Sequence, residues 1–324
     1  MTNAGAIIRG LGRNRISVAI SLLILCVAAF TLYHVLRHIE LEKVVAALRA
    51  QSDRKIVVAA GFVVAGYIAL TFYDLLALRT IGRRDIPFQV AAFASFTSYT
   101  IGHTLGAATL TGGLVRLRIY SCWGLNVIDI AKIAFLTGMT FALGVAVVLG
   151  GAMAYAPDAA GVVDRLPAGI NRMIGLAALL GVAGYLIWIM RGPRAVGRLG
   201  WRIILPDMRC TLLQIAVGAS DLSLVTLAMY TLLPDGPSIG IPTVLVVFLI
   251  ATLLGALSHA PGSLGVMEAA MLIGLPQFHR EDLLATLLTF RVLYFLAPLL
   301  FAALAFSLRE LRLVTRPPTP LRGS

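Results

Sequence analysis

Charged side chains are scarce in this chain, and cysteine is scarcer still. Asp, Glu, Lys and Arg make up 13% of the 324 residues and apolar side chains 59%, with a mean hydropathy of +0.91. This composition is typical of an integral membrane protein. The three cysteines, at positions 26, 122 and 210, are few, odd in number and widely spaced, so they predict neither a disulfide framework nor a metal site.

The short motifs of nucleotide and metalloenzyme chemistry are also missing. No H-E-x-x-H, P-loop or G-x-G-x-x-G pattern occurs, so nucleotide-driven transport has no support and no cofactor is expected. The net charge of +12 does not indicate a nucleic-acid partner, because the arginines stand at the ends of apolar runs. There they suit anionic lipid headgroups.

Long apolar runs are what the chain has in abundance. A helix needs about 20 apolar residues to cross a bilayer, and six runs are long enough: 16–36, 56–78, 127–152, 170–190, 211–233 and 283–308. The first is too long for a signal peptide and is predicted to be a retained anchor. We expect an all-α integral membrane fold, with residues 1–324 as one polytopic domain and a disordered tail over 312–324.

Two further runs, 88–123 and 241–276, are long but broken. The first is interrupted at 102–106 and 111–113, the second at Pro261, Gly262 and Gly265. Proline removes a backbone donor and glycine tolerates a tight bend, and the freed backbone groups must be buried in protein or face water. Each run is predicted to be a re-entrant hairpin. A kinked transmembrane helix is the alternative.

The order of runs predicts an inverted repeat. Residues 16–152 and 170–308 each contain two spans, a broken hairpin and a third span, in that order. Because each half crosses the membrane an odd number of times, the second half has the opposite orientation to the first. Such repeats are typical of secondary transporters. The arginine distribution predicts that both termini are cytoplasmic.

Four ordered motifs, at 67–76, 113–124, 259–268 and 290–295, resemble the lysylphosphatidylglycerol synthase transmembrane domain family. That family includes the flippase half of MprF-type proteins and standalone YbhN-like inner-membrane proteins. The resemblance implies handling of a phospholipid or another lipid-linked headgroup across the cytoplasmic membrane. In the two-part members a soluble aminoacyl-transferase domain follows the membrane part. This sequence ends soon after its last apolar run, so the resemblance is not expected to extend to aminoacyl-lipid synthesis.

Ionisable groups at membrane depth are costly and therefore candidates for function. A cavity with cations from both halves would suit a phosphate-bearing lipid, because arginine forms a fork for phosphate. Half-helix N-termini at 112–114 and 262–265 would add donors. The predicted translocation residues are Asp74, His103, Arg116, Arg118, Tyr120, Lys132, His259, Pro261, Gly262, Gly265, Glu268, Arg291 and Tyr294.

Structural interpretations of these residues stay open. Glu268 and Arg291 would form either a gate or a buried structural ion pair, and a turn histidine is commonly just hydrogen-bonded. Asp221 would bond across helices. Lys132 and Arg291 would be symmetry mates.

The predicted function is a lipid flippase of the bacterial inner membrane, whose partners are membrane lipids, anionic or phosphate-bearing. A homo-oligomer is compatible with the sequence. The alternative is an intramembrane lipid phosphoesterase that resembles polyprenyl-pyrophosphate phosphatases, although no acid-rich metal motif is visible.

Overall fold

The computed structural model describes residues 51–105, 108–192, 194–197, 202–258 and 261–314, together with Ala46 and Arg49. Most of them are helical, because a segment in lipid must satisfy its own backbone hydrogen bonds. The all-α prediction is confirmed. The elements are α3 (Asp53–Thr80), α4 (Phe88–Leu105), α5 (Ala108–Tyr120), η1 (Ser121–Trp123), α6 (Val127–Tyr155), α7 (Asp158–Asp164), α8 (Ala168–Met190), β1 (Ala195–Val196), β2 (Ile203–Ile204), α9 (Met208–Leu232), α10 (Ile241–Ser258), η2 (Pro261–Ser263), α11 (Val266–Gly274), α12 (Arg280–Arg291), the π-helical η3 (Val292–Leu296) and α13 (Ala297–Val314).

Within these described ranges, six helices are long and apolar enough to cross a membrane. Five of them, α3, α6, α8, α9 and the helix from α12 to α13, coincide with predicted spans. The first predicted span, 16–36, lies outside the described residues. The sixth helix is α10, which the sequence placed in a broken run. Re-entry of 88–123 and 241–276 into the membrane therefore stays a prediction. α13 continues to Val314, so residues 312–314 of the predicted tail are helical.

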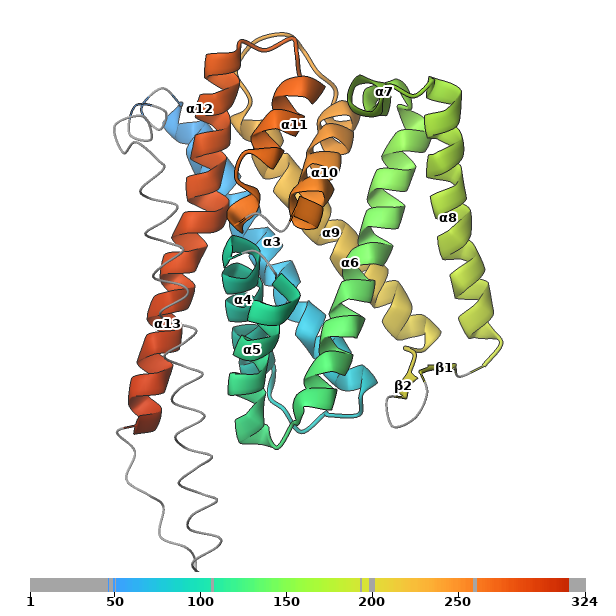
Figure 1. Ribbon diagram of the computed structural model, residues 1–324, viewed down its shortest axis with the longest axis vertical. Coiled ribbons are helices and arrows are strands. Elements are labelled where there is room, and N and C mark those ends of the chain that lie inside the picture. The colour runs from blue at the N-terminus through green and yellow to red at the C-terminus, as the bar shows by residue number, and fades with distance from the viewer. Residues whose placement is uncertain are drawn as a thin grey trace, which may run out of the picture.

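The two broken runs form helix pairs that face each other. Figure 1 shows α4 and α5 in the lower half of the molecule and α10 and α11 in the upper half, with their breaks toward the middle. The short helix η2 contacts α4 across this middle layer. A methyl group built at Gly262 would lie 3.8 Å from the carbonyl oxygen of Thr104, so the two pairs touch at their tips.

Glycines allow the long helices to cross closely. A methyl group built at Gly144 of α6 would lie 2.6 Å from the backbone of Gly218 on α9. One built at Gly175 of α8 would lie 2.6 Å from the carbonyl oxygen of Gly150. Small residues at crossings drive helix packing in membranes through van der Waals contact. Gly144 and Gly150 therefore serve close helix packing, whereas nothing lies within 4 Å of a methyl group built at Gly151.

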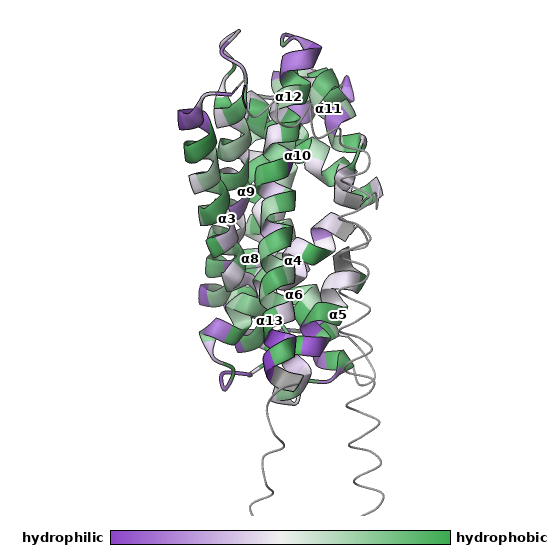
Figure 2. Cartoon of the chain, turned by 90° about the vertical axis from the view of Figure 1, so that its left-hand side faces the viewer, coloured by the Kyte–Doolittle hydropathy of each residue, from purple (hydrophilic) through white to green (hydrophobic). Residues whose placement is uncertain are grey.

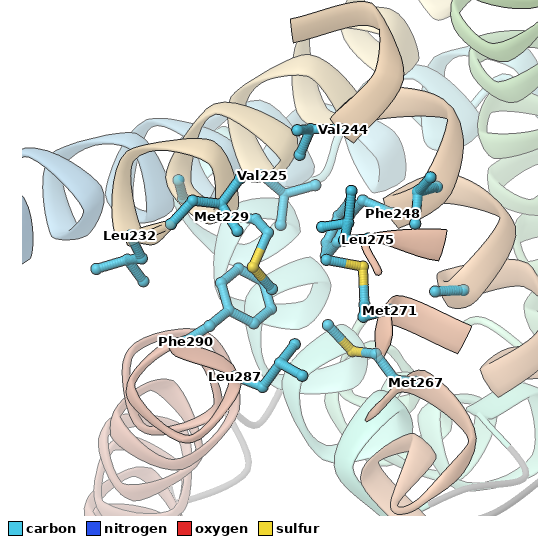
Figure 3. Packing of buried hydrophobic residues seen from close by; sticks show 14 of the residues in the cluster. Val225, Met229, Leu232, Val244, Phe248, Met267, Met271, Leu275, Leu287 and Phe290 are labelled. Atoms are coloured by element: carbon cyan, nitrogen blue, oxygen red, sulfur yellow. The ribbon is translucent and has the colours of Figure 1, made fainter. Parts of the chain in front are cut away.

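The buried apolar side chains gather in two main clusters. One joins α9, α10, α11 and α12, and Figure 3 shows Met229, Phe248, Met271 and Phe290 packed together within it. The other joins α3, α4, α5 and α6 with α13. Apolar colour covers the length of the bundle, and polar colour concentrates at its two ends (Figure 2). This pattern suits a chain whose outer face contacts lipid.

Connections at the ends are fixed by local polar contacts. Asn126 caps α6 by accepting the backbone N–H of Asp129 at 3.0 Å. In the loop after α3, the guanidinium of Arg83 donates to both carboxylate oxygens of Asp85, at 2.8 and 2.9 Å. This hydrogen bonding and charge lower the pKa of Asp85. The loop between α8 and α9 adds one short antiparallel strand pair, which the sequence did not predict.

Candidate functional site

A cavity of about 280 Å³ lies where the two broken helix pairs meet. Gly102 and His103 line it from the end of α4, and Gly255 and Ser263 line it from the second pair. Its remaining wall is mainly aromatic and aliphatic, with hydroxyl groups from Ser98, Thr137 and Thr252. A pocket with an apolar wall and a few convergent polar groups is the usual form of a binding site.

One side of the cavity is formed by Arg116, whose guanidinium is fixed by hydrogen bonds to a buried carboxylate. Arg116 on α5 donates from Nε and Nη2 to the carboxylate of Asp74 on α3, at 2.8–3.1 Å. The hydroxyl of Tyr120 donates to the same carboxylate at 2.9 Å. The guanidinium carbon of Arg116 also lies 5.3 Å from the ring centre of Tyr99, which is a cation–π contact. These contacts fix the orientation of Arg116 at the cavity wall.

The opposite charge in the cavity comes from α9. Asp221 is 6% exposed and lines the cavity, and its Oδ2 accepts a hydrogen bond from the hydroxyl of Tyr73 at 3.1 Å. Its Oδ1 is buried and makes no hydrogen bond within the part of the chain that the structure describes. Tyr73 and Asp74 are neighbours on α3, so adjacent residues reach α9 and α5 respectively.

The break in the second pair is shaped by left-handed backbone. Gly262 and Gly265 have φ of +57° and +79°, and Ser263 has φ of +55°. Glycine adopts this region without the steric cost that other residues bear. α11 then begins at Val266, and the carboxylate of Glu268 accepts the backbone N–H of Gly265 at 2.8 Å. The chain can therefore turn sharply here and start a new helix with its first donors satisfied.

Glu268 also forms an ion pair with Arg291, the last residue of α12. The guanidinium of Arg291 is 4% exposed, and its Nη1 would lie 3.7 Å from a methyl group built at Gly262. The pair thus joins the tip of the second helix pair to the helix that follows. Arg291 does not line the cavity itself, but its neighbours Phe290 and Tyr294 do.

Directly after Arg291 the helix widens into the π-helical segment η3. π-helical turns are rare and are often found at functional sites. The hydroxyl of Tyr67 on α3 donates to the backbone carbonyl of Tyr294 at 2.9 Å. Tyr294 lines the cavity, whereas Tyr67 lines a surface groove of about 420 Å³ between α3 and α13. The α3–α13 groove is lined by Ala60, Val63, Val64, Tyr67, Ile68, Thr71, Phe96, Leu293, Ala297, Pro298 and Phe301.

Several predicted residues lie elsewhere. Arg118 points away from Arg116, as their spacing of two predicts, but it is buried in an ion pair with Glu310 on α13. Lys132 on α6 is half-buried and does not line the cavity, so the structure does not pair it with Arg291 as a second cation of the site. His259 lies outside the described residues, and the side chain of Pro261 is not described.

The prediction that the backbone N–H groups at 112–114 start a helix and bind an anion is wrong. α5 begins at Ala108, so these residues lie inside the helix and their N–H groups are not at a helix start. A methyl group built at Gly112 would lie 3.0 Å from the carbonyl oxygen of Ser98 on α4. The glycine therefore serves close packing of the pair and does not break the helix.

Sequence reasoning missed part of the cavity wall. Tyr99 and Ser98 were not singled out, and Asp221 was interpreted as a cross-helix hydrogen bond. Tyr73, which donates to Asp221 but does not line the cavity, was not singled out either. A signal existed for Asp221, because an acid within an apolar run is costly unless it has a partner or a function. The aromatic residues gave no such signal, since aromatics in an apolar run are ordinary.

Comparison with known proteins places the chain among bacterial membrane proteins. No family model matches the sequence. The chain is 29% identical over 279 residues to the uncharacterized protein slr0712 of Synechocystis sp., an alignment that covers 85% of this chain and 86% of slr0712. It is 30% identical over 284 residues to the inner membrane protein YbhN of Escherichia coli K12, again covering 85% and 86% of the two chains. With its apolar helices, this chain is a multi-pass inner membrane protein that belongs to the YbhN family.

Proposed function

We propose that the protein moves a phospholipid or a lipid-linked headgroup across the cytoplasmic membrane, without hydrolysing a nucleotide. The observation that carries this proposal is the position of a cavity that contains Arg116, His103 and Asp221 beside an apolar surface groove, with the Tyr67–Tyr294 contact between the two. A lipid has the same division between headgroup and acyl chain. One molecule could place each part in the compartment that suits it.

The cavity has the chemistry for a phosphate. Arg116 uses Nε and Nη2 on Asp74, while its Nη1 has no hydrogen-bond partner within the described ranges. Arginine binds phosphate through charge-assisted hydrogen bonds. His103 is exposed at the same wall, and hydroxyl groups of Ser98 and Thr252 lie around it. A headgroup phosphate would exchange its water for these donors.

The α3–α13 groove has the chemistry for an acyl chain. Its lining is aliphatic and aromatic apart from Thr71 and the hydroxyl of Tyr67. Val64, Ile68 and Phe301 are 59%, 57% and 68% exposed, so the groove opens to the outer surface of the bundle. An acyl chain there would remain in contact with lipid while the headgroup crosses.

The Glu268–Arg291 pair would then act as a gate between α11 and α12. A phosphate that competes for Arg291 would release Glu268 and allow α11 to move relative to α12. The π-helical segment after Arg291 supports this role, because a wide turn can change to a regular one more easily than a straight helix can bend. The resemblance to the lysylphosphatidylglycerol synthase transmembrane family adds the lipid as the substrate class.

The test is translocation of a fluorescent phospholipid by the purified protein in liposomes. Label in the inner leaflet is protected from dithionite, so translocation increases the fraction that dithionite reduces. We expect faster loss of protection with wild-type protein than with protein-free liposomes. Phosphate release from lipid pyrophosphates is measured in parallel. Phosphate release without translocation would replace the proposal by the phosphoesterase alternative. The absence of both activities with every bacterial lipid tested would refute the proposal.

A conservative variant distinguishes loss of phosphate binding in the cavity from loss of the fold. Arg116→Lys keeps one positive charge near Asp74 but loses the planar fork. If phosphate binds at Nη1, translocation is expected to fall by about tenfold or more, the equivalent of one charge-assisted hydrogen bond. Thermal unfolding of the variant reports any loss of fold. Unchanged translocation by a folded Arg116→Lys protein would exclude Arg116 as the phosphate ligand.

A further inference from the structure

Asp221 differs from the buried acids Asp74 and Glu310 because these two form ion pairs with arginines. Asp74 and Glu310 are buried and pair with Arg116 and Arg118. Asp221 is buried as well, yet no cationic side chain of the described part of the chain lies within ion-pair distance of it. A buried carboxylate without a countercharge is costly, so such a group tends to take up a proton.

Although Asp221 lines the cavity, one of its two carboxylate oxygens is enclosed by protein. Oδ2 holds the Tyr73 hydroxyl, while Oδ1 is buried without a partner. A methyl group built at Gly66 on α3 would lie 3.8 Å from Oδ1. A metal cation needs a shell of several oxygen ligands, which one enclosed oxygen cannot supply. A hydrogen atom on Oδ1 needs no such shell.

The groups that face Asp221 are tyrosine hydroxyls, one histidine and one arginine that already pairs with Asp74. The packed elements α3, α4 and η3 present Tyr67, Tyr73, Tyr99 and Tyr294. Across the cavity lie His103 and Arg116, and the charge of Arg116 is shared with Asp74. The cavity linings from α6 and α10 contain no ionisable side chain. Protonation of Asp221 therefore raises the net charge of the cavity by one.

We propose that Asp221 takes up and releases one proton in each cycle, so that an anionic lipid and a proton cross the membrane together. This inference rests on the proposed lipid translocation. Protonation converts the carboxylate to a neutral carboxyl group, with the proton on Oδ1 and the Tyr73 hydroxyl still donating to Oδ2. The proton comes from water on the side to which the cavity opens and leaves to water on the other side.

Linkage gives the direction of this coupling. Neutralising Asp221 makes the cavity more positive by one charge, so an anionic headgroup binds more tightly to the protonated form. By reciprocity, the bound anion favours protonation of Asp221. Proton and anionic lipid therefore move in the same direction.

Proton binding can be tested without lipid transport. Infrared difference spectra of the purified full chain, recorded during a pH titration, should show the carbonyl band of a protonated carboxyl group that disappears as pH rises. Asp221→Asn should lose that band, whereas Glu281→Gln, at an exposed site in the first turn of α12, should keep it. Asparagine can still accept the Tyr73 hydrogen bond, so the variant is expected to fold. An unchanged titrating band in Asp221→Asn would show that another group carries the proton.

Coupling is tested in liposomes with fluorescent phosphatidylglycerol. A difference of one pH unit across the membrane should bias the label toward the alkaline side by about tenfold, if one proton crosses with each lipid. Asp221→Asn should lose the bias and Asp221→Glu should retain it. Translocation without any bias in the wild type would overturn the coupling and leave the lipid function intact. No translocation at all would overturn both, while the infrared titration would still decide whether Asp221 binds a proton.

Discussion

Among the described residues, each buried arginine has its own acid, and the partners are far apart in sequence. Arg116 pairs with Asp74 across 42 positions, Arg118 with Glu310 across 192, and Arg291 with Glu268 across 23. In the membrane interior such pairing offsets the cost of burying charge. The sequence singled out most of these residues because they are charged in an apolar context. It did not give the partners of Arg116 and Arg118, because pairing depends on which helices are neighbours.

The charge swap of Glu268 and Arg291 separates a gate from a structural pair. Either single change leaves an unpaired charge that is largely buried, and should lower the free energy of unfolding by about 3–5 kcal/mol. Glu268→Arg with Arg291→Glu should recover most of this loss, apart from about 1 kcal/mol for the lost cap on Gly265. If Arg291 must receive phosphate, the swapped protein should fold and yet not translocate lipid. Thermal unfolding and the liposome assay measure the two quantities.

Glu268→Gln is the matched control for the cap. The amide can still accept the Gly265 N–H but lacks the charge for Arg291, so its stability reports the ion pair alone. A swapped protein that translocates lipid at the wild-type rate would leave the pair with a structural role only.

At the scale of elements, glycine has two different uses in this fold. Gly262 and Gly265 have positive φ and allow the chain to break between α10 and α11. Gly112, Gly144 and Gly218 lie inside helices, where a missing side chain lets two backbones approach. Composition alone does not distinguish the two uses, which is why the break predicted at 111–113 was wrong. The proline beside Gly262 supplied the local signal that Gly112 lacks.

Gly144→Val tests the crossing of α6 and α9. Its first side-chain carbon would lie 2.6 Å from the backbone of Gly218, so the helices must move apart. Overpacking of this kind costs about 1–3 kcal/mol, and we expect a lower unfolding temperature in detergent. Gly151→Ala on the same helix has open space around the added methyl and should be neutral or slightly stabilising. Equal stability of both variants would mean that the crossing is not closely packed.

At the scale of the whole molecule, the loops divide between two ends. α7 and the α9–α10 loop lie at the upper end in Figure 1, and β1 and β2 lie at the lower end. Many arginines lie near the lower-end segments, including Arg79 in the last turn of α3, Arg83 and Arg84 after it, and Arg191 after α8. The positive-inside rule therefore predicts that the lower end is cytoplasmic.

Cysteine labelling tests this orientation. Cys26, Cys122 and Cys210 are first replaced, since Cys122 is exposed and would react. Single cysteines at Asp158 and Gly236 should then react with an impermeant maleimide on intact cells. One at Gly197 should react only after permeabilisation. The reverse pattern would invert the orientation, and labelling of Gly197 together with Asp158 from outside would contradict the predicted inverted repeat.

The sequence by itself determined the class of the protein, its main spans and the break at 261–265, because these depend on local hydropathy and on the backbone limits of proline and glycine. It also marked the ionisable residues that lipid does not tolerate without a partner. Only the tertiary structure decided that Asp74 holds Arg116, that Arg118 pairs with Glu310 away from the cavity, and that Asp221 bonds to Tyr73 with no described cation in ion-pair distance. Lipid is as apolar as a helix surface, so hydropathy does not state which helices touch. Close packing and polar contacts choose the neighbours, and these contacts join residues that are distant in the chain.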